Sequence, residues 1–499
     1  MSSKELSSKD ILQLDATAVR EELAEGRISA EDLMTATLDR VASLSNLNAI
    51  IALRNRNELL EQARQCDQTL RKKGAHSGRL LGIPIAIKDM SNAAGLPTTM
   101  GGSPLFRFHY PKKSDLFVQK IIDEGAIVIG KTNAPELGVG SHTFNKRWGT
   151  TVNPYATDKS AGGSSGGAAV ALAARMLCLA DGSDMMGSLR NPAGWNNIYS
   201  HRPTAGSIPE TTDSQNPNVN LLPYPISTPG PMARSPRDLA LLMDIMKGSN
   251  SSGEATIEDK PNVSGFKIAW LGDWGGNIPV EEGILTLSRA ALSVLVDKGV
   301  TVTDMTEPVF DLTELWKSWT TIRAKIIASN FPYPSLLLHS FLLVAPMRQE
   351  LKWEVRKGMA SSKEECKEAG NIARKWSTCL ENLFEKYDAL ALPTAQTWPF
   401  PAEWKWPQKI EETRMKTYHE WMTIAIPASL AGVPAITIPA GFGENQLPMG
   451  IQLLGKRGDD AKLLKLAQAY HVEIDWPGKR PPTCRPPQQQ NWIGRPWLC

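Results

Sequence analysis

Two glycine-serine clusters carry the hydroxyl groups of this sequence that are best placed to attack a carbonyl carbon. The first, 162–167, reads GGSSGG and contains Ser164, and the second, 184–188, reads DMMGS and ends at Ser188. A serine hydroxyl is a weak nucleophile until a neighbouring base takes its proton. Glycines let the backbone approach a reacting group closely. The two clusters therefore indicate a serine-based catalytic site.

A lysine supplies the candidate base. Lys88 directly follows the apolar stretch 83–87, which reads IPIAI. Burial beside such a strand disfavours the charged form of an amine and lowers its pKa toward the range of a working base. A single lysine in this position is more often a surface residue with a buried stem, so Lys88 is a candidate base only in combination with the two serines.

A histidine-dependent hydrolase is one alternative for the first cluster, because 162–166 fits the pattern G-x-S-x-G. That motif requires a strand before the serine, and the preceding segment 153–161 is polar and contains proline, so we expect no strand there. The histidine base would have to come from His339, His419 or His471. None of the three lies in a loop typical of such a base.

A phosphate-binding loop or a flexible turn is the other alternative for a run of glycines and serines. A phosphate-binding loop of the Walker type needs a lysine after its last glycine. Here Gly167 is followed by Ala168 and Ala169. The sequence therefore does not favour nucleotide binding.

The surrounding pattern predicts an α/β protein with helices at its start. Asp15 precedes one apolar-periodic run, and Ser29 with Asp32 forms a capping-box start for another. Short apolar segments alternate with helical ones further along, which is the rhythm of βαβ units. The predicted strands are 80–87, 126–129, 267–271 and 300–303, and the predicted helices are 115–124, 168–177, 236–246 and 280–297.

The C-terminal third is unusual in composition. Eight tryptophans lie between Trp316 and Trp421, which indicates either core packing or an aromatic wall around a substrate. The apolar stretch 336–345 is about half as long as a membrane-spanning helix, so we interpret it as a buried helix or a cap over a pocket. The end, 477–499, is rich in proline and predicts an extended, poorly packed tail.

Bulk composition excludes several classes of function. The chain has 55 basic and 52 acidic residues, a net charge of +3, and this balance does not favour nucleic acid as a partner. The six cysteines are scattered without metal-ligand spacing, as expected in a reducing compartment. The first ten residues are polar and unlike a signal peptide, so we expect a cytoplasmic location without a membrane span.

Together these elements resemble the amidase-signature family over about residues 10–475. The motifs that carry the resemblance are GIPIAIKD (82–89), GKTNAPELG (130–138), SAGGSSGGAAVALAA (160–174), DGSDMMGSLRNPA (181–193), GPMARSPRDLALLMDIM (230–246), LALPT (390–394), LAGVPAITIPAGF (430–442) and LPMGIQLLGKRGDDAKLLKLA (447–467).

The resemblance implies a Ser-cisSer-Lys triad. Lys88 is then the base, Ser164 the proton relay and Ser188 the nucleophile, with a cis peptide expected between Gly163 and Ser164. Neutral Lys88 would take the proton of Ser164 while Ser164 takes that of Ser188.

The resemblance also assigns the loop before Ser188. The oxyanion hole is expected from the backbone N–H groups of Met185, Met186, Gly187 and Ser188, with Asp184 and Arg190 pinning the loop. Substrate contacts are expected from Met185, Met186 and Gly138. The family most often has two glycines before the nucleophile, whereas this chain has Met186-Gly187. Adaptable apolar side chains at that place favour an apolar substrate.

The implied fold is an α/β/α sandwich around one large mixed sheet. We expect an N-terminal helical region (1–75), an amidase-signature domain (76–475) with a substrate cap inserted at about 310–420, and the proline-rich tail (476–499). No metal or organic cofactor is implied, and a homodimer is the expected assembly.

The expected reaction is hydrolysis of an amide, anilide or carbamate bond in a hydrophobic or aromatic small molecule, with esterase or urethanase activity as a side activity. Two other functions stay open. The glutamine-amidase subunit of a tRNA-dependent amidotransferase uses the same triad and would need partner subunits. An inactive binding scaffold would have lost triad residues, and this chain retains all three.

Overall fold

The computed structural model describes residues 7–73, 78–209, 221–248, 257–330 and 348–484. Its centre is a mixed eight-stranded sheet in the order β12-β11-β13-β17-β16-β9-β10-β8. A smaller sheet has the order β1-β3-β2. The strands of the two sheets are β1 (Ile50–Ile51), β2 (Pro84–Lys88), β3 (Ile127–Thr132), β8 (Leu179–Asp184), β9 (Tyr199–Arg202), β10 (Thr228–Ala233), β11 (Lys267–Trp270), β12 (Thr301–Asp304), β13 (Ala389–Pro393), β16 (Ala435–Phe442) and β17 (Pro448–Leu454).

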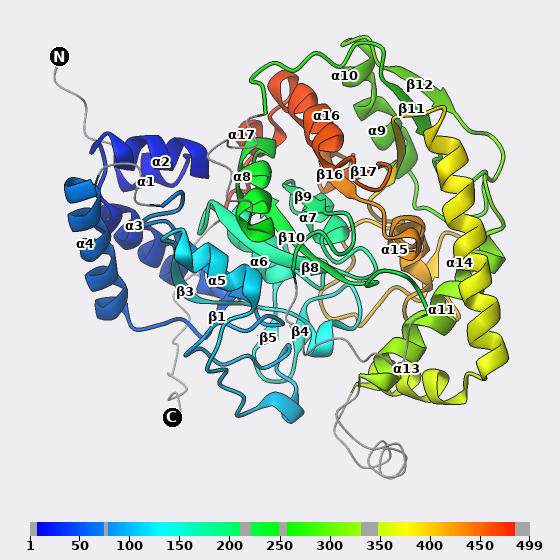
Figure 1. The fold of residues 1–499 in the computed structure, drawn as a ribbon, viewed down its shortest axis with the longest axis horizontal. Coiled ribbons are helices and arrows are strands. Elements are labelled where there is room, and N and C mark those ends of the chain that lie inside the picture. Colours follow the sequence, from blue (N-terminus) through cyan, green and yellow to red (C-terminus); the bar gives the residue numbers. More distant parts are fainter. Residues whose placement is uncertain (1–6, 74–77, 210–220, 249–256, 331–347, 485–499) are drawn as a thin grey trace.

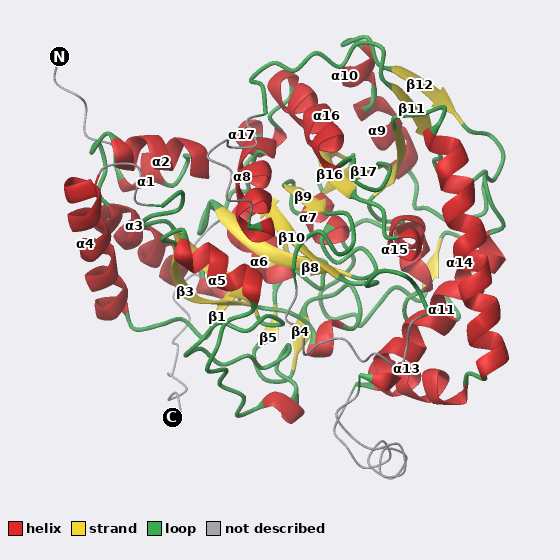
Figure 2. Cartoon of the chain, viewed as in Figure 1, coloured by secondary structure: helices red, strands yellow, loops and turns green. Residues whose placement is uncertain are grey.

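Helices surround these strands on both faces, as Figure 2 shows by colour. Helices α8 and α16 pack on each other and on the central sheet, while α6 packs on β8 and β10 and contacts α7. The helices are α1 (Ser8–Ile11), α2 (Ala16–Ala24), α3 (Ala30–Ser43), α4 (Arg56–Lys73), α5 (Leu116–Asp123), α6 (Gly166–Ala173), α7 (Arg190–Trp195), α8 (Pro236–Lys247), α9 (Ile284–Ala291), α10 (Ser293–Val296), α11 (Leu312–Ser329), α13 (Gln349–Ala360), α14 (Lys363–Phe384), α15 (Ile426–Ala431), α16 (Asp460–Glu473) and α17 (Trp476–Lys479).

The α/β/α architecture predicted from the sequence is confirmed, with one difference in detail. The predicted single sheet is divided, and edge strand β2 of the small sheet packs beside edge strand β8 of the large one. The N-terminal helices α1–α4 lie at one side of the molecule in Figure 1, and α11, α13 and α14 lie at the opposite side. The strands that end in Lys88 and Asp184 pack beside each other.

Local sequence signals account for most of these elements. Ser29 caps α3 and forms the capping box with Asp32, as predicted. Ser235 caps α8, and that helix ends at Gly248, whose φ of 75° lies in the left-handed region. Both predicted βαβ units are present, because β2 pairs with β3, and β11 with β12, in parallel. The strand β7 (Ala156–Ser160), which pairs with β6 (Val152–Asn153), was not expected.

Three other segments differ from the sequence prediction. The helix predicted at 280–297 begins only at Ile284, because Gly283 has a φ of 82°, and it is divided into α9 and α10. The helix predicted at 168–177 ends at Ala173, and Arg175 follows with a φ of 57°. The tail begins with the short helix α17, which packs on β16, so its first residues are not extended.

The tryptophan-rich region contributes mainly to a second hydrophobic core. Trp319, Trp376 and Trp421 are buried there, whereas Trp404 is about half exposed. The apolar stretch 336–345 lies outside the described residues. Within the described ranges, no helix combines the length and apolar character needed to cross a bilayer.

Candidate active site

Lys88 and Ser164 lie in direct hydrogen-bonding contact. Lys88 is the last residue of β2 and is fully buried. Its Nζ lies 2.8 Å from Ser164 Oγ, 2.8 Å from Ser165 Oγ and 3.0 Å from Ser183 Oγ. Three hydroxyl groups therefore surround the amine, and one of them belongs to the predicted relay serine.

Burial controls the protonation of this amine. It lowers the pKa of Lys88 from the ordinary lysine range to about 7, although the negative charges of Asp181 and Asp184 act in the opposite direction. A large fraction of Lys88 is then neutral near pH 7. A neutral amine at 2.8 Å from Ser164 Oγ can accept its proton.

The Ser164 loop is held in a compact form by its neighbours. The Gly163–Ser164 peptide is cis, as the resemblance predicts. Ser141 Oγ donates to the Gly163 carbonyl at 2.5 Å. A Cβ atom on Gly166 would lie 2.3 Å from Thr143 Oγ1, so only glycine allows α6 to begin at this place.

Ser188 lies in the loop between β8 and α7, next to the Ser164 loop. The Ser165 N–H group donates to the Ser188 carbonyl at 3.2 Å, and this bond joins the two glycine-serine clusters. Ser188 is 8% exposed. Among the described residues, no group hydrogen-bonds to its Oγ, so the hydroxyl is not committed to a structural role.

Asp184 and Arg190 pin the Ser188 loop, as predicted. Arg190 Nη2 lies 2.9 Å from Asp184 Oδ1, and both side chains are fully buried. Burial alone would raise the pKa of Asp184, but the charge and hydrogen bonds of Arg190, with the charge of Arg202, hold that pKa well below its ordinary value. Arg190 also donates to Gln452 Oε1 at 2.7 Å, which anchors the loop to β17.

The four predicted oxyanion donors do not have equal access to a substrate. The Gly187 N–H group donates to Asp184 Oδ1 at 2.8 Å and is therefore occupied. The N–H groups of Met185, Met186 and Ser188 have no acceptor within the described part of the chain. The structure thus leaves three of the four predicted donors available for a developing oxyanion, and Gly187 shapes the turn with its φ of 82°.

The three residues predicted to contact substrate, Gly138, Met185 and Met186, differ in how accessible they are. A Cβ atom on Gly138 would lie 3.7 Å from Ser164 Oγ, which places this glycine at the site. Met186 is buried, and its Sδ accepts a hydrogen bond from Trp319 Nε1 at 3.1 Å. Met185 is only half-buried. Of the two methionines, Met185 has the more accessible side chain.

Two polar residues of β8 were not singled out from the sequence, although both lie in the motif DGSDMMGS. Ser183 contacts Lys88 Nζ, and Asp181 Oδ1 accepts a hydrogen bond from the Lys88 N–H group at 2.8 Å. The sequence could have indicated them only through the two-residue spacing of Asp181 and Ser183, because alternate residues of a strand point to the same face.

The histidine-dependent alternative finds no support in the geometry. The strand β7 does precede the Ser164 loop, contrary to expectation. It pairs with β6, forms a single bridge from Lys159 to Pro401, and lies outside the central sheet. His419 is buried against Trp316, and His471 contacts Tyr199. His339 lies outside the described residues.

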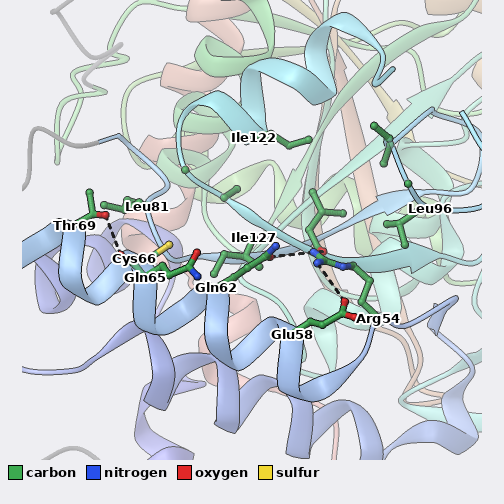
Figure 3. Close-up of a pocket in the computed structure, with 16 residues that line it drawn as sticks. Arg54, Glu58, Gln62, Gln65, Cys66, Thr69, Leu81, Leu96, Ile122 and Ile127 are labelled. Atoms are coloured by element: carbon green, nitrogen blue, oxygen red, sulfur yellow. Dashed lines mark hydrogen bonds and ion pairs between the residues drawn. The ribbon is translucent and has the colours of Figure 1, made fainter. Parts of the chain in front are cut away.

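A separate groove lies between α4 and the small sheet, lined by residues that precede Ser164 and Ser188 in the sequence. Its volume is about 660 Å³, and Arg54, Glu58 and Cys66 are among its lining residues (Figure 3). Lys88, Ser164 and Ser188 do not line it. In the described part of the chain, no three His, Cys, Asp or Glu side chains gather in a metal-binding cluster.

Comparison with known proteins identifies the family of this chain. The model of the Amidase family matches residues 32–464. A glutamyl-tRNA(Gln) amidotransferase subunit of Chloroflexus aurantiacus is 30% identical, over 95% of this chain and 99% of that protein. The acylamidase of Rhodococcus erythropolis is 28% identical, over 95% and 98% respectively. The crystal structure of a bacterial aryl acylamidase superposes with a TM-score of 0.83 at 23% identity, over 94% of this chain and 99% of that one.

The chain belongs to the amidase family, also called the amidase-signature enzymes, which hydrolyse carbon–nitrogen bonds. The likeness to the aryl acylamidase shows the fold that this family shares.

Proposed function

We propose that the protein hydrolyses an amide, anilide or carbamate bond in a hydrophobic or aromatic small molecule, using Lys88, Ser164 and Ser188. The observation that carries the proposal is the buried Lys88 amine at 2.8 Å from Ser164 Oγ. The backbone bond from Ser165 to Ser188 brings the second serine loop to the same place.

The first half of the reaction forms an acyl-enzyme. Neutral Lys88 takes the proton of Ser164 as Ser164 takes that of Ser188, and Ser188 Oγ bonds to the substrate carbonyl carbon. The available N–H groups of the loop before and at Ser188 donate to the oxygen that becomes negative. The proton then returns through Ser164 to the nitrogen, the carbon–nitrogen bond breaks, and an amine leaves.

The second half regenerates the enzyme. Water enters where the amine left and loses a proton to the same relay as it bonds to the acyl carbon. The carbon–oxygen bond to Ser188 then breaks, and Ser188 recovers its proton. No metal or organic cofactor is required for these steps.

The apolar surroundings of the loop support a hydrophobic substrate. Met185 offers a half-buried thioether next to the proposed donors, and Gly138 borders Ser164 Oγ. We propose that the region 310–420, which includes α11, α13 and α14, serves as the substrate cap, because Trp319 of α11 contacts Met186. We also propose that the protein forms a homodimer and is located in the cytoplasm.

A second candidate function is that of a glutamine-amidase subunit. It is supported by the 30% identity to the amidotransferase subunit over nearly the whole of both chains. It would require a polar pocket and partner subunits. The half-buried Met185 favours the small-molecule amidase instead.

A turnover screen tests the proposal. Purified protein is assayed for amine or ammonia release from an aryl amide, a short aliphatic amide, an aryl carbamate and glutamine, and for hydrolysis of a matched aryl ester. Preference for the aryl amide or carbamate supports the proposal. Preference for glutamine would favour the amidotransferase function, and lack of turnover together with no covalent labelling of Ser188 would favour an inactive scaffold.

A further inference from the structure

Lys88 lies where the two sheets of the protein meet. It ends β2, the edge strand of the small sheet, and β2 packs against β8, the edge strand of the large sheet. Asp181 is the third residue of β8, and its Oδ1 accepts a hydrogen bond from the Lys88 N–H group at 2.8 Å. An edge-strand donor is thus satisfied by a carboxylate, which brings a negative charge beside the base.

The Asp181 carboxylate is only half satisfied by this bond. The side chain is fully buried, and its Oδ2 has no hydrogen-bond partner among the described residues. A buried polar atom without a partner costs free energy, and a buried carboxylate costs more unless positive charge lies nearby. Lys88 and Lys131 are the cations that attract it. The carboxylate therefore depends electrostatically on both lysines, on Lys131 more than on Lys88.

The other charged groups around this pair have partners of their own. Asp184, at the end of β8, is paired with Arg190 and lies near Arg202. Asp89, which follows Lys88, accepts hydrogen bonds from the N–H groups of Thr99 and Gly101. Lys131 of β3 donates to the Ser91 carbonyl and Thr98 Oγ1, and its charge interacts with Asp89 and Asp181. Asp181 is the carboxylate whose hydrogen bonding is directed to Lys88 itself.

We propose that Asp181 is a positioning residue for the lysine base: it fixes the end of β2 through the Lys88 N–H group and supplies the negative charge that keeps the buried amine basic enough to drive the serine relay. This inference rests on the proposed function, because it assumes that Lys88 is the base. It is supported by the electrostatics, since burial lowers the pKa of Lys88 and the Asp181 charge is the largest influence in the opposite direction.

The charges around Lys88 determine the direction in which its pKa should change when Asp181 is replaced. Asp181→Asn keeps an oxygen acceptor for the Lys88 N–H group and removes the negative charge. The pKa of Lys88 should then fall further, because desolvation is no longer opposed by Asp181. Ser188 should react at lower pH than in the wild type, with a lower plateau rate, because a base of lower pKa is a weaker base.

The experiment measures the rate at which a fluorophosphonate labels Ser188, by intact mass, between pH 5 and about pH 9. The midpoint of the acid limb should move down by about one pH unit in Asp181→Asn, the effect expected of one nearby charge. Asp181→Glu retains a carboxylate and should keep a midpoint nearer that of the wild type. Asp460→Asn removes another buried carboxylate, one that contacts His201 and Thr204, and should leave the midpoint unchanged.

A second measurement needs no substitution at Asp181. In protein with ¹³C-labelled aspartate carboxyl groups, the Asp181 resonance should titrate at higher pH in Lys88→Met than in the wild type, because a neighbouring cation has been removed. An unchanged midpoint in a folded Asp181→Asn variant would overturn the inference, as would an unchanged Asp181 titration in Lys88→Met. Labelling of Lys88→Met at the wild-type rate would instead refute the proposed function, whatever Asp181 does.

Discussion

The two methionines before Ser188 should have separable roles, and paired alanine substitutions test this. Met186 is 4% exposed and packs in the second hydrophobic core with Trp319. Truncating a buried methionine to alanine typically costs about 2–5 kcal/mol, because transfer free energy is lost and a cavity remains. Met185 is half-buried, so the same truncation there should cost less.

Substrate preference should depend on Met185 more than on Met186, in contrast to stability. A thioether contact with an aromatic ring contributes about 0.3–1.5 kcal/mol, which corresponds to roughly a two- to tenfold change in kcat/KM. Met185→Ala should therefore lower the kcat/KM of an aryl amide relative to that of propionamide by about this factor. Met186→Ala should lower both values together, through weaker packing behind the oxyanion loop.

The assay combines thermal unfolding with kcat/KM for acetanilide and propionamide in both variants. A Met186→Ala variant as stable as the wild type would contradict its burial against Trp319. A Met185→Ala variant with an unchanged substrate ratio would refute the interpretation of Met185 as a substrate-facing apolar group.

The remaining predictions concern the relay, the loop and pH. Ser164→Ala should reduce amide hydrolysis by about 10²–10⁴, the usual contribution of one acid–base group, with a smaller loss for a matched ester whose leaving group needs less protonation; equal losses would indicate a purely structural serine. Asp184→Asn leaves the Arg190 guanidinium buried without its charge partner and should lower the free energy of unfolding by about 3–5 kcal/mol in urea denaturation; a change near zero would contradict the pinning role. The wild-type kcat/KM should rise with pH through about 7 as Lys88 loses its proton, and a flat profile from pH 5 to 9 would argue against a lysine base.

The local parts of the fold were predictable because short-range chemistry determines them. Ser29, Asp32 and Ser235 satisfy backbone N–H groups of the helices that follow, wherever those helices pack. The apolar run before Lys88 indicated a strand, and only together with the two serine clusters did it indicate that Lys88, at the end of that strand, is desolvated.

Features that join distant segments were not predictable from spacing. Trp319 and Met186 are far apart in the sequence, and only tertiary packing brings the indole N–H group to the sulfur. The split into two sheets depends on which edge strands meet, and Asp181 gains its contact with Lys88 only at that seam. The occupation of the Gly187 N–H group by Asp184 likewise depends on side-chain geometry that the motif does not specify.

Peptide mapping after fluorophosphonate treatment identifies the nucleophile of the protein directly. The wild-type protein should carry one adduct, located on Ser188, and Lys88→Met should form it far more slowly at pH 7, because Ser164 then has no base at 2.8 Å to take its proton. An adduct on Ser164, or labelling of Ser188 at an equal rate in Lys88→Met, would contradict the proposed triad.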